Sequence, residues 1–180
     1  MKLILIKNKI TSKQNIALIG MAGAGKSMVG KKLAFKLKYI FLDLDDLLEI
    51  KYKKNLDQII KDIGEEKFID LEEKYLIDLL KHGPQNTVFS PGGSIILSEK
   101  AMKELKKRAL IIFINTPYSL IKSRTFHEKT RGAVIGMKER GGLRKVYNYR
   151  LPLYKKYSDM KISTGHLSEE EVVDKIIKLL

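Results

Sequence analysis

A glycine-rich segment that ends in a lysine and a serine carries the strongest chemical signal in this chain. Residues 20–27 read Gly-Met-Ala-Gly-Ala-Gly-Lys-Ser, the spacing of a phosphate-binding loop, between an apolar run and a stretch of helical period. In such a loop, backbone N–H groups and the first turn of the helix surround phosphate oxygens. Lys26 supplies positive charge to the β- and γ-phosphates, and the Ser27 hydroxyl is a ligand for Mg²⁺. The segment predicts a site for ATP and Mg²⁺, whereas a turn that binds nothing would leave the lysine without an anion.

Three carboxylates follow the next apolar run, at Asp43, Asp45 and Asp46. If that run is a strand of a parallel sheet, they lie at its carboxyl end, where open α/β sheets bind their ligands. One carboxylate there can hold Mg²⁺ or one of its waters, and another can accept the proton of an attacking hydroxyl. These roles suit Asp43 and Asp45. The alternative is N-capping of the following helix, which could be the only role of Asp46.

A basic segment rich in glycine spans residues 125–142 and has no clean helical or strand period. It contains Arg131 together with lysines and several glycines. An ordinary surface loop can have this composition, but in a phosphotransferase a basic loop of this length is more typical of a lid that closes over phosphates. We therefore predict a lid at residues 125–142.

The strands and helices that position these residues are indicated by the sequence pattern, in which short apolar runs alternate with longer segments of helical period. Such an alternation is typical of an α/β protein whose parallel sheet is flanked by helices. The pattern predicts five parallel strands at residues 16–19, 39–42, 87–90, 109–114 and 160–163. It predicts helices at residues 26–37, 45–52, 56–63, 65–81, 98–107, 117–126, 143–157 and 168–180. Ser168 and Glu171 have the spacing of a capping box, and Pro117 stands where a first-turn proline is tolerated.

Composition limits the classes of protein to which the chain can belong. Its 180 residues, 44% hydrophobic and 31% charged, suffice for a single domain with one core. The absence of cysteine excludes disulfides and thiolate metal sites, and the apolar run near the first residue is too short for a signal peptide or a membrane span. We expect a cytoplasmic protein that is a monomer and has no membrane partner.

The formal net charge of +14 invites a reading as a nucleic-acid binder. The lysines are spread over predicted helix faces, however, without an RNA-binding aromatic signature or a basic tail. We interpret the excess charge as a solvated surface that attracts anionic substrates. We therefore expect a small-molecule substrate and no nucleic acid.

Several motifs resemble those of the shikimate kinases, in the same order, from residue 15 to the C-terminus. The phosphate-binding loop and the acidic pair in residues 43–45 come first. Residues 64–72, with Gly64-Glu65 followed by Phe68 and Glu72, resemble the start of the family's substrate-domain helix. Residues 90–94, Ser-Pro-Gly-Gly-Ser, resemble its glycine triplet. Residues 150–154, Arg-Leu-Pro-Leu-Tyr, resemble the segment near whose start an arginine binds the substrate carboxylate.

This resemblance implies an ATP-dependent kinase that phosphorylates the 3-hydroxyl of shikimate, and a three-layer P-loop kinase fold. It implies a single domain over residues 1–180 with its core from about residue 15, a small helical substrate-binding subdomain at about residues 44–80, and the lid. Asp45 would bind and deprotonate the reacting hydroxyl, Arg131 would neutralise the transferring phosphoryl group, and Arg124 would lie along the adenine.

The site residues that the resemblance implies fall into four groups. The catalytic residues would be Lys26, Asp45 and Arg131. The nucleotide-binding residues would be Gly23, Ala24, Gly25, Lys26, Ser27, Met28, Arg124 and Arg131. The substrate-binding residues would be Asp45, Gly92, Gly93 and Arg150, and the metal ligands Ser27 and Asp43.

Two positions depart from the family's pattern, both where the acceptor would bind. Ile69 replaces a second carboxylate-binding arginine, and Ser94 replaces the third glycine. Loss of one bidentate arginine should weaken carboxylate binding by roughly one to three powers of ten unless another cation compensates, such as Lys67 or Lys74. The chain thus resembles a divergent member with an altered acceptor site. The alternatives are a kinase for another hydroxylated metabolite and a non-catalytic nucleotide-binding protein; an apolar wall opposite Arg150 would argue against shikimate.

Overall fold

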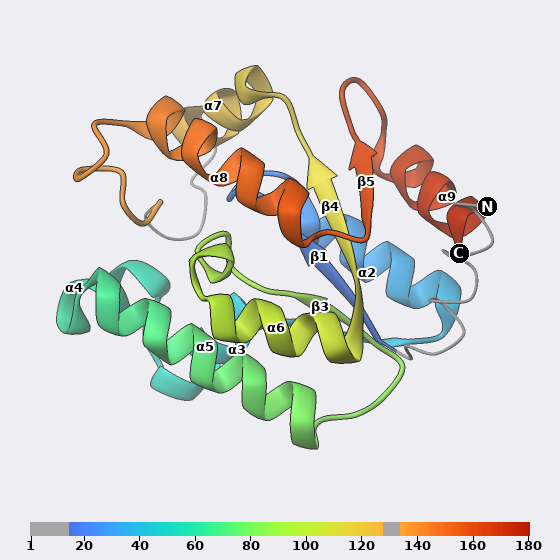
Figure 1. Cartoon of the computed structure of the whole chain (residues 1–180), viewed down its shortest axis with the longest axis horizontal. Helices are drawn as coiled ribbons and strands as arrows, with labels where there is room; N and C mark the ends of the chain where they lie inside the picture. Colours follow the sequence, from blue (N-terminus) through green and yellow to red (C-terminus); the bar gives the residue numbers. More distant parts are fainter. Residues whose placement is uncertain (1–14, 128–133) are drawn as a thin grey trace.

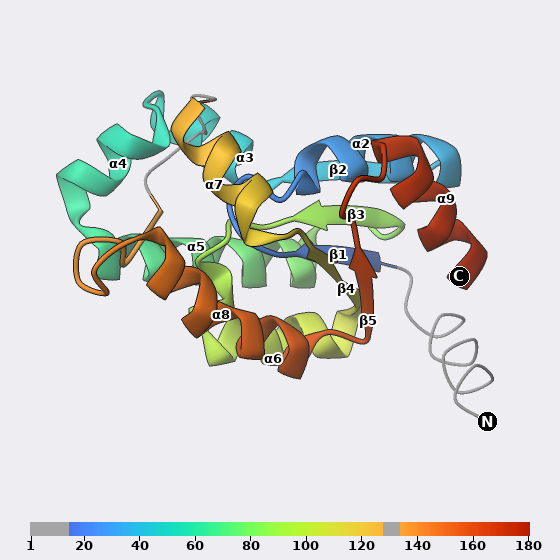
Figure 2. The same ribbon diagram turned by 90° about the horizontal axis from the view of Figure 1, so that it is seen from above.

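The computed structural model describes residues 15–127 and 134–180, which form a parallel sheet between two layers of helices (Figure 1, Figure 2). Neighbouring strands follow the order β2-β3-β1-β4-β5, and every pair is parallel. The strands are β1 Asn15–Ile19, β2 Ile40–Asp43, β3 Thr87–Ser90, β4 Ala109–Asn115 and β5 Met160–Ser163. The five predicted strands are confirmed, and their ends differ from the prediction by at most one residue.

Helices cover both faces of the sheet. In Figure 2, α2 and α9 lie on one face, and α5, α6 and α8 lie on the other. The helix α4 packs against both α3 and α5. Their bounds are α2 Lys26–Leu37, α3 Leu44–Tyr52, α4 Leu56–Ile63, α5 Glu65–His82, α6 Glu99–Arg108, α7 Tyr118–His127, α8 Leu143–Tyr157 and α9 Glu169–Leu179. The three-layer α/β architecture is therefore confirmed.

Local sequence explains where several helices begin. Ser168 caps α9 in a capping box with Glu171, as predicted. Pro117 stands one residue before α7 rather than in its first turn, and its carbonyl accepts N–H groups from that turn. The structure adds one element that periodicity did not predict, the 3-10 helix η1 at Ile95–Leu97. Three residues are too few to display a period.

One boundary of the predicted lid is wrong. Residues 125–127 belong to the end of α7, because the helix continues beyond the last apolar position that the sequence pattern indicated. The Thr125 hydroxyl donates to the carbonyl of Ile121 at 2.8 Å, an i−4 hydrogen bond typical of a helical threonine.

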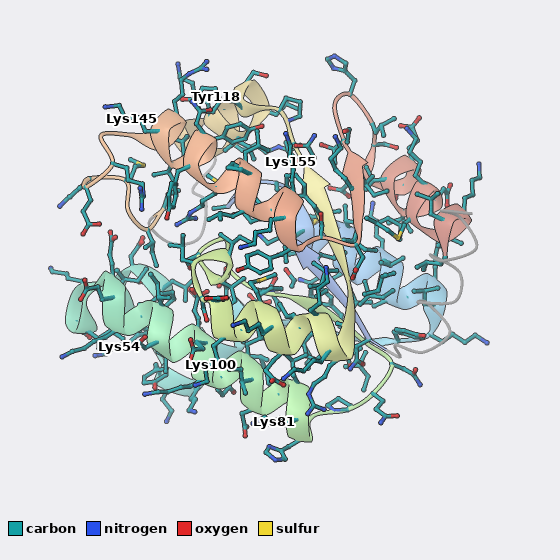
Figure 3. All side chains as sticks on the ribbon, viewed as in Figure 1. Lys54, Lys81, Lys100, Tyr118, Lys145 and Lys155 are labelled. Carbon is teal, nitrogen blue, oxygen red and sulfur yellow. The ribbon has the colours of Figure 1, made fainter. Side chains whose placement is uncertain are left out.

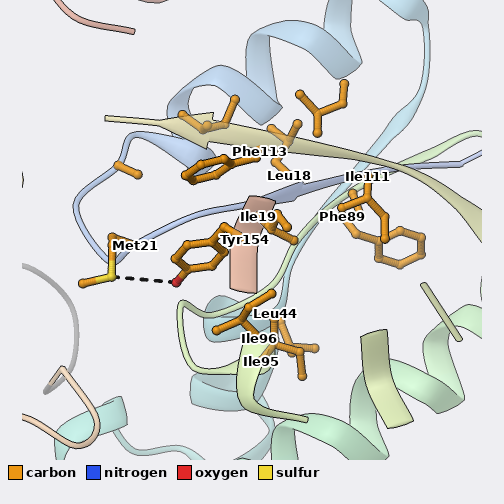
Figure 4. Packing of buried hydrophobic residues seen from close by; sticks show 14 of the residues in the cluster. Leu18, Ile19, Met21, Leu44, Phe89, Ile95, Ile96, Ile111, Phe113 and Tyr154 are labelled. Carbon is orange, nitrogen blue, oxygen red and sulfur yellow. Dashed lines mark hydrogen bonds between the residues drawn. The ribbon is translucent and has the colours of Figure 1, made fainter. Parts of the chain in front are cut away.

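The core lies between the sheet and both helical layers, and Figure 4 shows part of it. Tyr154 of α8 stacks on Phe113 of β4 with the ring centroids 5.1 Å apart. Its hydroxyl lies 3.8 Å from the sulfur of Met21, just after β1 (Figure 4). Because aromatic burial is a large stabilising contribution, this contact anchors α8 beside the loop that follows β1.

Positive charge is spread widely over the surface. The labelled lysines in Figure 3, at positions 54, 81, 100, 145 and 155, are exposed and come from different parts of the chain. Within residues 15–127 and 134–180, none of the helices has both the length and the apolar character needed to cross a membrane.

Candidate active site

The phosphate-binding loop lies at the carboxyl end of β1, where the strand order reverses between β3 and β4. Open α/β sheets bind their ligands at such a switch point, because the loops on either side diverge. A cleft of about 580 Å³ opens there, and it is lined by the loop together with Asp43, Asp45, Gly93 and Arg124. Gly23, Ala24, Gly25, Lys26, Ser27 and Met28, all predicted to bind nucleotide, line the same cleft.

Lys26 begins α2 and is buried, and its Nζ donates to the carbonyl oxygen of Met21 at 3.2 Å. Burial lowers the pKa of Lys26, whereas the negative charges of Asp45, Asp43 and Glu72 act in the opposite direction. The surrounding carboxylates thus stabilise the ammonium form inside the cleft. An ammonium group held by its own loop at a helix N-terminus is suited to contact phosphate oxygens.

Arg124 reaches the phosphate-binding loop from α7. Its Nη1 donates to the carbonyl of Gly23 at 3.0 Å, so the guanidinium lies against the loop. This arrangement brings a further positive charge to the nucleotide cleft, beside those of Lys26 and Lys31. The contact of Arg124 with the adenine ring stays a prediction.

Ser27 and Asp43, the predicted metal ligands, are hydrogen-bonded through the serine hydroxyl and Oδ2 of the aspartate. A hydroxyl and a carboxylate side by side fit Mg²⁺, which takes few protein oxygens and completes its shell with phosphates and waters. The other oxygen of Asp43 accepts the N–H of Asp45 at 3.1 Å and caps α3. The capping role that the sequence suggested for Asp46 is therefore wrong, because the helix begins two residues earlier.

A smaller pocket of about 30 Å³ adjoins this cleft, and Ala22, Asp45 and Gly93 line both. The walls of the smaller pocket also include apolar side chains of α4 and α5 and the residues Val134 and Ile135. Asp45 thus stands where the nucleotide cleft meets a second pocket. That is the position required of a group that must reach both a phosphate and an acceptor.

Gly92 and Gly93 form one wall of the smaller pocket. A Cβ at Gly92 would lie 2.1 Å from Oε1 of Glu72, and a Cβ at Gly93 would lie 2.9 Å from the backbone nitrogen of Ala22. A side chain at Gly93 would therefore push apart the loops after β1 and β3, and one at Gly92 would collide with the carboxylate of Glu72 on α5. Both glycines are in the substrate-binding group that the sequence predicted.

Arg150 reaches the same pocket from α8 and is only 2% exposed. Its Nη1 donates to the carbonyl of Gly93 at 3.1 Å, and its Nη2 donates to the carbonyl of Ile135 at 2.9 Å. Tyr154, one helical turn later, donates to the same Gly93 carbonyl at 2.8 Å. Burial raises the pKa of Tyr154 to about 12, so the hydroxyl keeps its proton. The two bonds to the Gly93 carbonyl hold the glycine segment in place.

The cation expected opposite Arg150 is not among the described residues that line this pocket. Ile69 packs against the apolar core and is not part of the pocket wall. Lys67 and Lys74 are exposed, and neither lines the pocket. The suggested compensation by either lysine is therefore wrong, because both lie on the solvent side of α5.

Glu72 is a pocket residue for which the sequence analysis assigned no role. It is fully buried, its Oε2 accepts a hydrogen bond from the hydroxyl of Ser94, and its Oε1 has no partner among the described residues. Burial and then the charge of Asp45 raise the pKa of Glu72 to about 8. Its spacing was an available signal, because Phe68 and Leu76, four residues before and after it, both belong to the buried face of α5.

The nucleotide side also contains residues that no motif indicated. Thr116, after β4, donates to the carbonyl of Ala24 at 3.1 Å and lies 3.0 Å from the hydroxyl of Thr164, after β5. Thr164, Gly165 and Leu167 line the nucleotide cleft. Their position at strand ends was the only signal in the sequence, because they are distant from the phosphate-binding loop along the chain.

Arg131, predicted to neutralise the transferring phosphoryl group, lies outside the described residues, as does most of the first half of the predicted lid. Two described residues of that segment lie in the wall of the smaller pocket. Val134 and Ile135 are buried in its wall, and the N–H of Gly136 donates to Oε2 of Glu65 at 2.6 Å. Gly136, within the predicted lid segment, is therefore joined to the first residue of α5.

Comparisons with known proteins agree with this geometry. The family model for shikimate kinase matches residues 22–180. The shikimate kinase of Thermodesulfovibrio yellowstonii is 34% identical over 165 residues, which cover 92% of this chain and 94% of the relative. The solved shikimate kinase from Acinetobacter baumannii in complex with shikimate is 30% identical with a TM-score of 0.84, covering 96% and 95% of the two chains. That from Aquifex aeolicus is 29% identical with a TM-score of 0.74, covering 91% and 94%.

Proposed function

This chain belongs to the shikimate kinase family, and we propose that Asp45 and Lys26 carry out its phosphoryl transfer at the junction of the two adjoining pockets. The reaction is the ATP-dependent phosphorylation of shikimate, with Mg²⁺ as the metal ion. One observation supports the residue roles most directly: Asp45 and Gly93 line both the nucleotide cleft and the smaller pocket.

Asp45 activates the acceptor. A hydroxyl group bound in the smaller pocket is within reach of its carboxylate, which orients the hydroxyl and accepts its proton as the oxygen attacks the γ-phosphate. Lys26 and Arg131 stabilise the negative charge that develops on the transferring group. Ser27 and Asp43 would hold Mg²⁺, which would neutralise phosphate charge when bound.

Arg150 and the glycine backbone bind the acceptor. Because two of its N–H groups hold the carbonyls of Gly93 and Ile135, the guanidinium is oriented before the acceptor arrives. Such preorganisation lowers the cost of binding an anion. The acceptor's 3-hydroxyl is then directed towards Asp45 by the walls of the pocket.

The helices at residues 44–80 act as the acceptor-binding subdomain, and the segment at residues 125–142 acts as the lid. Two observations support this division: α4 and α5 supply pocket-lining side chains, and Val134 and Ile135 complete the wall. We further expect a cytoplasmic monomer that binds neither nucleic acid nor membrane. Light scattering of the purified protein, with and without RNA, checks the oligomeric state and the nucleic-acid prediction.

The test replaces Asp45→Asn and measures ADP release with shikimate as the acceptor. We expect kcat to fall by about 10²–10⁴-fold, because general-base catalysis contributes about that much, while the Kd for MgATP changes little. Asp46→Asn is the matched control, because Asp46 is its neighbour on α3 and lines neither pocket, and it should keep kcat.

Equal loss of ATP affinity and turnover in Asp45→Asn would contradict the acceptor role of Asp45. The acceptor itself is tested with a panel of sugar acids and polyols beside shikimate. A higher kcat/KM for any of these than for shikimate would support the alternative of a related kinase for another metabolite.

A further inference from the structure

The smaller pocket, proposed above to bind the acceptor and called the acceptor pocket from here on, is lined by a buried carboxyl oxygen that has no hydrogen-bond partner among the described residues. Glu72 is fully buried, and its Oε1 has no hydrogen-bond partner within the part of the chain that the structure describes. A Cβ built on Gly92 would meet this oxygen at 2.1 Å and Oδ1 of Asp45 at 3.0 Å, so both carboxylates border the same wall of the pocket. An unpaired polar atom in such a place is costly unless a ligand completes it.

The two departures from the family's motifs meet at this side chain. Position 69 precedes Glu72 by three residues on α5, and an arginine there would be close enough to pair with its carboxylate. The chain has Ile69 instead, packed against the core. The second departure, Ser94, supplies the hydroxyl that donates to Oε2 of Glu72. The Ser94 hydroxyl therefore replaces one of the hydrogen-bond donors that an arginine would provide. It bonds Oε2, so Oε1 stays open to the pocket.

We propose that Glu72 binds the anionic acceptor as a neutral carboxylic acid, donating the proton on Oε1 to an oxygen of the acceptor. The proposal rests on the proposed function, since it takes shikimate as the acceptor. With Ser94 donating to Oε2, Oε1 is the oxygen on which the proton belongs. A neutral acid can donate a hydrogen bond to an anion in the pocket, as a second cation would, without the cost of burying another charge.

Burial favours this neutral form, the hydrogen bond from Ser94 opposes it, and the neighbouring charges act in both directions. Asp45 on α3 is a negative neighbour, whereas Arg150 on α8 and Lys26 on α2 are positive. The helix α4 contributes only the apolar Leu56 and Ile60 to the pocket. Burial is the largest effect on its pKa, which lies at about 8, so the acid is mostly protonated near neutral pH.

The acceptor brings one more negative charge into this pocket. An ionised Glu72 would then face two anions, with Arg150 as the only cation among the described residues of the wall. Binding of the acceptor should therefore draw Glu72 further towards its protonated form. Acceptor binding and proton binding are coupled, and this coupling is measurable without catalysis.

The test is calorimetry of shikimate binding to the full-length protein without nucleotide, in two buffers of different ionisation enthalpy. Near pH 8, where about half of Glu72 is ionised, binding should take up about half a proton, and near pH 6 it should take up almost none. The affinity should weaken about tenfold between about pH 7 and about pH 9.

Two variants separate the contribution of Glu72 to the proton uptake from that of other titrating groups, such as Lys26. Glu72→Gln keeps a donor of the same shape, so it should bind shikimate with an affinity independent of pH and without proton uptake. Glu73→Gln is the matched control, because Glu73 contacts Ser98 and Lys100 instead and should behave as the wild type. If Glu72→Gln does not fold, Ile69→Arg serves, because pairing with an arginine should keep Glu72 ionised and abolish the uptake.

The possible failures are distinct. The role of Glu72 would be overturned if the wild type bound shikimate with an affinity independent of pH, or if Glu72→Gln took up the same fraction of a proton as the wild type. Either result would leave the kinase assignment intact. No binding of shikimate near pH 6 would contradict the acceptor itself, and the role of Glu72 with it.

Discussion

Individual side chains at this site do two tasks at once. Asp43 caps α3 and accepts a hydrogen bond from the Ser27 hydroxyl, so the residue predicted to support Mg²⁺ also begins the helix that carries Asp45. Arg150 holds two backbone carbonyls while it lines the acceptor pocket. Substitutions at such residues therefore disturb geometry as well as charge, and a useful test must separate the two effects.

Arg150→Lys tests how much the fork geometry of the guanidinium contributes. A lysine keeps the charge but cannot hold the carbonyls of Gly93 and Ile135 and the acceptor together. We expect KM for shikimate to rise by about 10–100-fold, as for the loss of charge-assisted hydrogen bonds, with KM for ATP nearly unchanged. Steady-state kinetics with each substrate varied in turn measures both constants.

The control for this substitution is Arg144→Lys. Arg144 lies on the same helix, but its guanidinium stacks 4.3 Å from the ring centroid of Tyr118, away from the acceptor pocket. Its replacement should leave both KM values as in the wild type. If Arg150→Lys raised KM for ATP as much as KM for shikimate, Arg150 would instead support the structure of the whole cleft.

At the scale of elements, two helices begin with the same type of N-terminal cap but lie in different parts of the molecule. Asn55 and Gln58 form a capping box on α4, and Ser168 and Glu171 form one on α9. The helix α4 supplies pocket residues, whereas α9 packs on α2 at the opposite face of the sheet from α8. The same loss of a cap should therefore have different consequences for function.

Asn55→Ala and Ser168→Ala each remove one cap, which should lower the free energy of unfolding by about 1 kcal/mol and Tm by about 2–4 °C. Only Asn55→Ala should also raise KM for shikimate, by a few-fold, because the first turn of α4 frays beside the pocket. Thermal unfolding and steady-state kinetics measure the two effects. An equal rise of KM in Ser168→Ala would show that the effect is global loss of stability.

For the whole molecule, the buried acid links the site to stability. The pKa of Glu72 is about 8 in the folded protein against an ordinary 4.5, so the folded state binds more protons between these values. The free energy of unfolding should therefore fall as the pH rises from about 4.5 to about 8. Glu72→Gln removes this dependence, and its Tm relative to the wild type should be higher near pH 9 than near pH 5.

Glu73→Gln again provides the comparison. Hydrogen bonds from Ser98 and Lys100 lower the pKa of Glu73, so its stabilising effect is present throughout the range above its ordinary pKa and is lost only in acid. Its difference in Tm from the wild type should be the same near pH 5 and near pH 9. A rising trend in both variants would assign the pH dependence to a group other than Glu72.

The sequence alone determined the parallel sheet, the helix bounds to within one residue and the phosphate-binding loop. These features depend on local patterns, such as hydrophobic period, caps and a motif of fixed spacing, which residues close in the chain express by themselves. It also located both departures from the family's motifs, at Ile69 and Ser94. It did not reveal that the two are connected.

Only the tertiary structure decided what lies in the acceptor pocket. Lys67 and Lys74 were reasonable candidates by distance along the chain, yet their side chains face solvent, whereas Glu72 faces the pocket. Its environment is assembled from α3, α5, α8 and the loop after β3, which are separate in sequence. Burial and charge act through space and not along the chain, so the state of this acid follows from the folded arrangement alone.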